Sequence, residues 1–412
     1  MKEVSAKKPS GKGGKAKKKL ALSDSGGDEK FESIDFILKH FKIQNWKDFQ
    51  GLTYTAEEVL QLLEMTIECL STEKNALVKV VPPITIVGDL NGQFRDLIRI
   101  FNVKTADGEK GKEEDELNRL PFASQRFLFL GNYTEGGRWN LETICLIFAL
   151  KYFFDKRYIL LRGCQETCTS TEFEGQLYKK WPSQAKEIWA QFQKAFSLMP
   201  VAATVGDKIL CVHSGISPEM RDSLAEMQTM KTGEETVTPL VRDLVNACPV
   251  EEDGVGAEAD EPVYLISVNR DYTKTFNEAA VKVFCEKTKI QLIVRSHEVP
   301  LNGFRFFADR RLITIFSASM YNNYNNKSAF LNVDATGKVA IVQLQTCAPN
   351  VEKPEQKVKK SAEKVVDKSE EKKKKKTTHK SAEKVVEKTP VVKKATSKPS
   401  KELESIFDNI SG

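Results

Sequence analysis

Five apolar runs in this chain each end on a side chain that could bind a metal ion or transfer a proton. The first run, residues 84–87, is followed by Gly88 and Asp89. The four later runs end on further polar residues, namely Asn132, Cys164 with Gln165, His213 and His297. Short apolar runs rich in β-branched residues are typical of buried strands. Because ligands bind beyond the carboxyl ends of strands in α/β sheets, we expect these side chains to form one site.

Cys164, His213 and His297 form a chemically consistent subset of these residues. A thiolate with two imidazoles suits a single zinc ion, with Asn132 or water as the fourth ligand. The two histidines could equally be hydrogen-bonded residues of the core, because both follow apolar strands. The sequence leaves these two interpretations open.

Segments with helical spacing of apolar residues precede and separate these strands. The helices that they form must position the site. Residues 31–41 and 54–74 carry apolar side chains at helical intervals, with Thr55 as an N-cap, so two helices precede the first strand. The alternation that follows predicts an α/β fold with a βαβαβ order. We expect a helix across residues 172–199, and three short strands after residue 310 that form an antiparallel sheet ending near residue 344.

Charge is distributed unevenly along the 412 residues, whose formal net charge is +6. The formal net charge is +5 for residues 1–30, +7 for residues 351–412 and −6 for the part between them. We expect a disordered basic arm at 1–30, a folded domain at 31–348 and a Lys-rich tail at 349–412 that ends in a short helix. The tails could tether the chain to nucleic acid or acidic partners, which the salt dependence of retention on nucleic acid tests.

The sequence predicts a soluble, intracellular protein of the nucleus or the cytoplasm, without membrane partners. No apolar run approaches the roughly 20 residues of a membrane-spanning helix, and the N-terminus lacks the apolar core of a signal peptide. The lysines at 372–376 match a nuclear-import signal of low specificity. Five cysteines lie in or beside apolar runs, which favours reduced thiols over a disulfide framework: Cys69, Cys145, Cys211, Cys285 and Cys347.

Six motifs in this order resemble the phosphoprotein phosphatase family of serine/threonine phosphatases, and most closely its type-1 catalytic subunits. They are GDLNGQF, LFLGNYTEGG, LLRGCQE, VHSGISP, RSHE and SASMY, and the resemblance covers about residues 31–344. It implies a metallophosphoesterase-type β-sandwich flanked by helices, with two divalent metals at the strand ends. In that family a hydroxide that bridges the two metals attacks the phosphorus atom.

The resemblance also implies that the metal site is degenerate. Three positions keep family ligands: Asp89, His213 and His297. Asn91 stands at a metal-binding histidine, Asn132 at the aspartate that bridges both metals, and Cys164 at a ligand asparagine. A neutral amide cannot hold two dications together as a carboxylate does. We therefore expect no metal cofactor or, at most, one divalent ion, zinc or manganese, in place of the family's two.

The groups that the family uses for proton transfer and phosphate binding are changed as well. Gln165 stands at the histidine that serves as general acid, and a glutamine amide has no proton to give. Glu135 replaces the aspartate that orients this histidine. Of two phosphate-binding arginines, one position is Gly136 and the other matches Arg270, whereas Tyr321 matches an active-site tyrosine.

The type-1 groove for short regulatory motifs aligns with eight residues of this chain: Ile209, Leu292, Phe306, Arg310, Ile313, Leu331, Val339 and Ile341. If the groove is present, regulatory or scaffolding proteins with short apolar docking motifs would bind beside an edge strand, and phosphoproteins would be further clients. The alternative is that these apolar strand residues belong to the core.

Together these observations favour a catalytically inactive pseudophosphatase that acts as a binding module. One alternative is a weak or altered metal-dependent phosphatase of phosphoserine and phosphothreonine that uses Asp89, Arg270 and the two histidines. The other is the tether to nucleic acid or acidic partners through the lysine tails. Metal analysis of the purified protein separates the first two.

Overall fold

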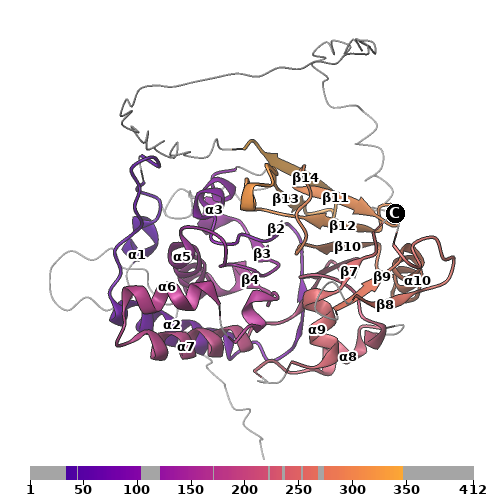
Figure 1. Cartoon of the computed structure of the whole chain (residues 1–412), viewed down its shortest axis with the longest axis horizontal. Helices are drawn as coiled ribbons and strands as arrows, with labels where there is room; N and C mark the ends of the chain where they lie inside the picture. Colours follow the sequence, from indigo (N-terminus) through magenta and orange to yellow (C-terminus); the bar gives the residue numbers. More distant parts are fainter. Residues whose placement is uncertain are drawn as a thin grey trace, which may run out of the picture. The chain divides into compact units, whose positions relative to one another are not determined.

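A computed structural model describes residues 34–346, apart from 44, 104–120, 170, 221–222, 234–236, 252–253 and 268–272 (Figure 1). The predicted arm at 1–30, the predicted tail at 349–412 with its short terminal helix, and Arg270 lie outside the described residues.

Two sheets carry the strand ends that the sequence singled out (Figure 1). The five-stranded sheet has the order β14-β13-β2-β3-β4, and its strands are Val339–Leu344, Ser328–Val333, Ile84–Val87, Phe127–Phe129 and Tyr158–Leu160. The six-stranded sheet has the order β1-β5-β6-β10-β12-β11, and its strands are Leu77–Val80, Ala202–Val205, Ile209–Val212, Leu292–Arg295, Leu312–Ile315 and Phe304–Phe307. A small third sheet has the order β7-β9-β8, formed by Cys248–Pro249, Thr273–Phe276 and Tyr264–Ser267.

The pairing within these sheets confirms part of the predicted topology and corrects the rest. β2, β3 and β4 are parallel, as the βαβαβ order predicts, and β13 pairs antiparallel with β14. The expected antiparallel sheet of three late strands is wrong for β12, which runs parallel to β10 in the other sheet. β12 also pairs antiparallel with β11, a strand whose four residues include an exposed arginine, Arg305, so its pattern was too weak to be recognised.

The helices begin and end where local sequence signals place them. Thr55 caps α2 (Ala56–Leu70) with a capping box, since its side chain accepts from the Glu58 amide and Glu58 binds the Thr55 amide. The helix predicted across 172–199 is divided into α6 (Glu172–Lys180) and α7 (Ala185–Ser197). The break falls at Trp181, because a residue that precedes proline is disfavoured in the helical conformation. The other helices are α1 (Asp35–Lys39), α3 (Phe94–Phe101), α4 (Pro121–Ser124), α5 (Asn140–Phe153), α8 (Ala225–Thr229), α9 (Pro239–Asn246) and α10 (Glu278–Thr288).

Helices cover the outer face of each sheet (Figure 1). Phe127 and Phe129 of β3 pack with the core of α2, α3, α5 and α7, while α9 and α10 pack on the six-stranded sheet. Leu128 lies between these phenylalanines and is also fully buried, so it faces the opposite way. Two sheets packed in this way and covered by helices form the β-sandwich that the family resemblance implied.

Two further predictions about the chain can be checked against the described residues. Within them, no helix is both long and apolar enough to cross a bilayer. Seven cysteines of the described ranges are free thiols, and Cys145, Cys211 and Cys285 are buried among apolar side chains. Cys347 lies outside the described residues.

Candidate functional site

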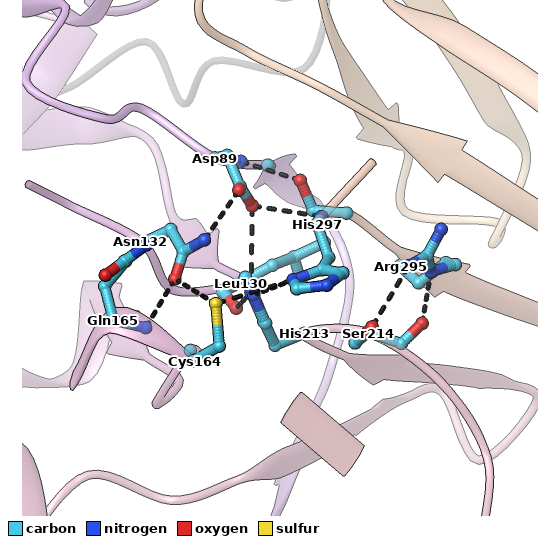
Figure 2. Close-up of polar contacts among 12 residues, drawn as sticks. Asp89, Leu130, Asn132, Cys164, Gln165, His213, Ser214, Arg295 and His297 are labelled. Carbon is cyan, nitrogen blue, oxygen red and sulfur yellow. Dashed lines mark hydrogen bonds and ion pairs between the residues drawn. The ribbon is translucent and has the colours of Figure 1, made fainter. Parts of the chain in front are cut away.

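The structure brings five of the predicted strand-end residues into contact (Figure 2). Asp89, Asn132 and Cys164 follow β2, β3 and β4 of one sheet, whereas His213 and His297 follow β6 and β10 of the other. Asp89 and Asn132 are 1% and 4% exposed, and His213 is fully buried. Carboxyl ends of strands from both sheets therefore meet at one polar cluster inside an apolar sandwich.

Hydrogen bonds fix the orientation of the Asn132 amide. Its Oδ1 accepts from the backbone N–H of Gln165 over 3.0 Å and from the Cys164 thiol over 3.4 Å. Its Nδ2 donates to Oδ2 of Asp89 over 2.8 Å. Since the backbone N–H can only donate and the Asp89 carboxylate accepts, only this orientation of the amide satisfies both partners. The N–H₂ group therefore points at the one retained carboxylate of the cluster.

The protonation state of His213 follows in the same way. Its Nδ1 lies 2.9 Å from the carbonyl oxygen of Leu130, which can only accept, so Nδ1 carries a proton. Burial lowers the pKa of His213 although Asp89, 3.7 Å from Nδ1, raises it, so the ring is neutral and Nε2 presents a lone pair. This Nε2 lies 3.3 Å from Nδ1 of His297, which in turn lies 3.5 Å from Sγ of Cys164 (Figure 2).

The Cys164 thiol is held in its protonated form. Burial raises its pKa well above the usual range, and the nearby Asp89 carboxylate raises it further. A thiol with a raised pKa is a poor nucleophile, because the thiolate is the reactive form. Chemistry at Cys164 therefore requires a positive charge that stabilises the thiolate.

Glu166 was not assigned a role from the sequence, although it lies in the LLRGCQE motif. Its carboxylate accepts from the backbone N–H groups of Asn132, Tyr133 and Gly163 at 2.8, 3.1 and 2.9 Å. Burial raises its pKa to about 7, against the lowering effect of these three hydrogen bonds. Glu166 thus joins the turns after β3 and β4, which carry Asn132 and Cys164.

Two of the described positions that align with proton transfer and phosphate binding, Glu135 and Tyr321, contact α6 and Gly136 respectively. Both carboxylate oxygens of Glu135 accept from the first amides of α6: Oε2 from Glu172 at 2.9 Å and Oε1 from Phe173 at 3.0 Å. A carboxylate is favourable there because the amides at a helix N-terminus lack partners within the helix. Tyr321 lies against Gly136, where an added Cβ would be 2.9 Å from its ring. Asn91 is buried in the turn after Asp89, with a φ of 45°.

The eight predicted groove residues divide by exposure. Five are at most 2% exposed and belong to the buried strands: Ile209, Leu292, Ile313, Leu331 and Val339. Phe306 and Ile341 are partly exposed, and the Arg310 guanidinium lies over the Phe306 ring at 5.2 Å. Phe306 lies on β11 and Ile341 on β14, which are the edge strands of their sheets. Of the eight residues, only Phe306, Arg310 and Ile341 are therefore accessible from the surface.

The comparison with known proteins identifies the family. The calcineurin-like phosphoesterase model matches residues 82–301, which contain all five strand-end residues. The chain belongs to this family. Within it, the serine/threonine-protein phosphatase PP1-delta of Caenorhabditis elegans is 30% identical over 286 residues, which is 68% of this chain and 85% of that protein. These matches place the chain among the phosphoprotein phosphatases.

A solved structure supports the same fold. It is a protein serine/threonine phosphatase from Saccharomyces cerevisiae, described as similar to human phosphatase PP5. Its TM-score is 0.59 with 19% sequence identity, and the alignment covers 71% of this chain and 91% of that one.

The donor atoms of this calcineurin-like site fit one metal ion and do not fit two. The ligand atoms of Cys164, His213 and His297 lie within 4.8 Å of one another. In contrast, the amide that replaces the bridging aspartate directs its Nδ2 toward Asp89. An N–H₂ group repels a cation where a carboxylate oxygen would bind it, so no bridge between two dications can form with this arrangement.

Proposed function

We propose that this chain is a pseudophosphatase, a serine/threonine phosphatase fold that does not hydrolyse phosphoesters efficiently and acts as a binding module. The observation that carries the proposal is the hydrogen bond from Nδ2 of Asn132 to Asp89 at 2.8 Å. In the family, a carboxylate at this position would hold two metals and their bridging hydroxide. The amide has no charge to hold them, and it is already bonded to the remaining carboxylate.

Two further losses support the proposal. The side chain of Gln165 accepts from Cys168, and its neutral amide cannot protonate a leaving alkoxide. Gly136 provides no guanidinium for a phosphate group. Because a nucleophile, a general acid and a phosphate-binding group act as a unit in catalysis, their combined loss should abolish turnover rather than reduce it slightly.

Turnover of phosphoserine and phosphothreonine peptides tests the proposal. With excess manganese or zinc, the full chain should hydrolyse them at no more than about a thousandth of the rate of an intact relative, since a missing general acid alone costs about 10²–10⁴-fold. PP1-delta assayed in parallel is the positive control. A rate within about tenfold of it would show an active phosphatase, and dependence of that rate on one bound metal would identify the altered enzyme instead.

We also propose the partners of the binding module. Proteins with short apolar motifs would add beside β14 and place their side chains against Phe306 and Ile341, and phosphoproteins would be clients. The lysine tails, outside the described residues, would add an attraction to nucleic acid that weakens with salt. The nucleus and the cytoplasm are the proposed compartments. For the cofactor, we propose at most one divalent ion, zinc or manganese.

A peptide with a basic residue, then valine, any residue and phenylalanine should bind with micromolar affinity. Burial of two apolar anchors contributes about 1.5–3 kcal/mol each, less the cost of ordering the peptide. In calorimetry, Phe306→Ala should weaken binding about tenfold or more, while Ile266→Ala, an exposed residue of β8, should leave it unchanged. If no heat is found at millimolar peptide, or if both variants bind equally well, this face is not a docking groove.

A further inference from the structure

The clustered side chains Cys164, His213 and His297 come from different sheets of the sandwich. Cys164 follows β4 in the five-stranded sheet, whereas the histidines follow β6 and β10 in the six-stranded sheet. The cysteine is separated from His297 by 133 residues along the chain. We propose that these three side chains bind one zinc ion that cross-links the two sheets, as a structural site rather than a phosphatase centre.

The distances between the donor atoms match a tetrahedral zinc site. Zn–N bonds of about 2.05 Å and Zn–S bonds of about 2.3 Å at tetrahedral angles separate two nitrogens by about 3.3 Å, and nitrogen from sulfur by about 3.6 Å. Nε2 of His213 and Nδ1 of His297 are 3.3 Å apart, and Sγ of Cys164 is 3.5 Å from the latter. The ligand atoms of Cys164 and His213 also lie within 4.8 Å of each other, so a small movement of the partly exposed Cys164 completes the site.

The surroundings of His213 are those of a metal ligand. Metal-binding histidines donate their second ring N–H to a backbone carbonyl or a carboxylate, which fixes the ring and its tautomer. His213 donates Nδ1–H to Leu130 and lies 3.7 Å from Asp89, and its Nε2 lone pair faces the cluster (Figure 2). Asp89 also accepts from the backbone N–H of His297 over 3.2 Å, so one carboxylate lies beside the His213 ring and holds the main chain of His297.

The donor types favour zinc over manganese. A thiolate and two imidazoles are ligands that zinc prefers, whereas manganese prefers carboxylates and water. Binding requires that the Cys164 thiol lose its proton to solvent, and the metal charge stabilises the resulting thiolate. Oδ1 of Asn132, 3.4 Å from Sγ, accepts the thiol proton in the metal-free state and can serve as the fourth donor once that proton is lost.

Cobalt(II) gives a direct readout of the thiolate. The full chain should bind one cobalt ion and show the near-ultraviolet sulfur-to-cobalt charge-transfer band and the visible bands of a tetrahedral site. Cys164→Ser should abolish the charge-transfer band. Cys168→Ser is the matched control, because this exposed thiol lies four residues further along and outside the cluster, and it should keep the band.

Thermal unfolding tests the cross-link. Zinc at about a thousandfold excess over its dissociation constant should raise the Tm on the order of 5–10 °C in the parent and in Cys168→Ser, and manganese should raise it much less. Cys164→Ser should lose the zinc effect while melting within about 2 °C of the parent in chelator, which shows that it folds. A cobalt complex without the sulfur band, or an undiminished zinc shift in Cys164→Ser, would overturn the proposal. Neither readout depends on turnover, so this proposal and the proposed function can fail separately.

Discussion

Replacement of Glu166 by alanine should lower the free energy of unfolding by about 3–5 kcal/mol. The substitution leaves three buried backbone N–H groups without their acceptor, those of Asn132, Tyr133 and Gly163. Each unsatisfied buried donor costs about 1–3 kcal/mol, although some relaxation of the two turns reduces the sum. At pH 8, above the folded-state pKa of about 7, the wild-type carboxylate is ionised and accepts all three bonds.

Urea unfolding at pH 8 measures this loss, with Glu64→Ala as the control. Glu64 is an exposed glutamate within α2, and its removal should change the free energy of unfolding by no more than about 0.5 kcal/mol. Because Glu166 joins the turns that carry Asn132 and Cys164, its replacement should also weaken cobalt binding. A loss below about 1 kcal/mol would show that water replaces the carboxylate at the three amides.

The strand ends were predictable because the signal is local. An apolar run that stops at a polar residue specifies both a buried strand and the place where its last side chains emerge, and this holds at Asp89, Asn132 and His213. The sequence could not specify which sheet each strand joins. β12 has the same local pattern as β13, yet it pairs with β10 and β11, because pairing is decided by packing between distant segments.

Contacts made through the backbone were also beyond prediction. The tautomer of His213 depends on the carbonyl of Leu130, and the position of Glu135 depends on where α6 begins, 37 residues away. Glu166 shows no local pattern that distinguishes it from a surface glutamate. The groove prediction had the same weakness. An apolar strand residue such as Ile209 or Ile313 gives the same sequence pattern whether it lies in the core or lines a groove, and both are buried.

Gly136→Ala should destabilise the chain by about 2–3 kcal/mol, which limits any restoration of phosphatase chemistry. Gly136 has a φ of +73°, a conformation that costs other residues about 1–2 kcal/mol. In addition, the new Cβ would lie 2.9 Å from Cε2 and 3.1 Å from Oη of Tyr321, so the ring must move. Gly136→Arg carries the same Cβ and a larger side chain, and should cost at least as much.

A double-mutant cycle separates the two causes. In a Tyr321→Ala background, Gly136→Ala should cost only the backbone part, about 1–2 kcal/mol. Gly175→Ala is the control, and it should change the free energy of unfolding in the opposite direction. Gly175 lies within α6 with nothing within 4 Å of an added Cβ, so alanine should stabilise the chain by up to about 1 kcal/mol. Equal costs of Gly136→Ala in both backgrounds would show that Tyr321 does not obstruct the position.

This result bears directly on the catalytic restoration that the family resemblance suggests. Asn91→His, Asn132→Asp, Cys164→Asn and Gln165→His add no Cβ to the backbone, whereas Gly136→Arg adds one only 2.9 Å from the Tyr321 ring. We therefore expect the four substitutions together, without Gly136→Arg, to give the highest turnover among the folded variants. Each of them alone should stay at background, because bridge, ligand and acid act as a unit. Full activity from Asn132→Asp alone would contradict this account of why the site is inactive.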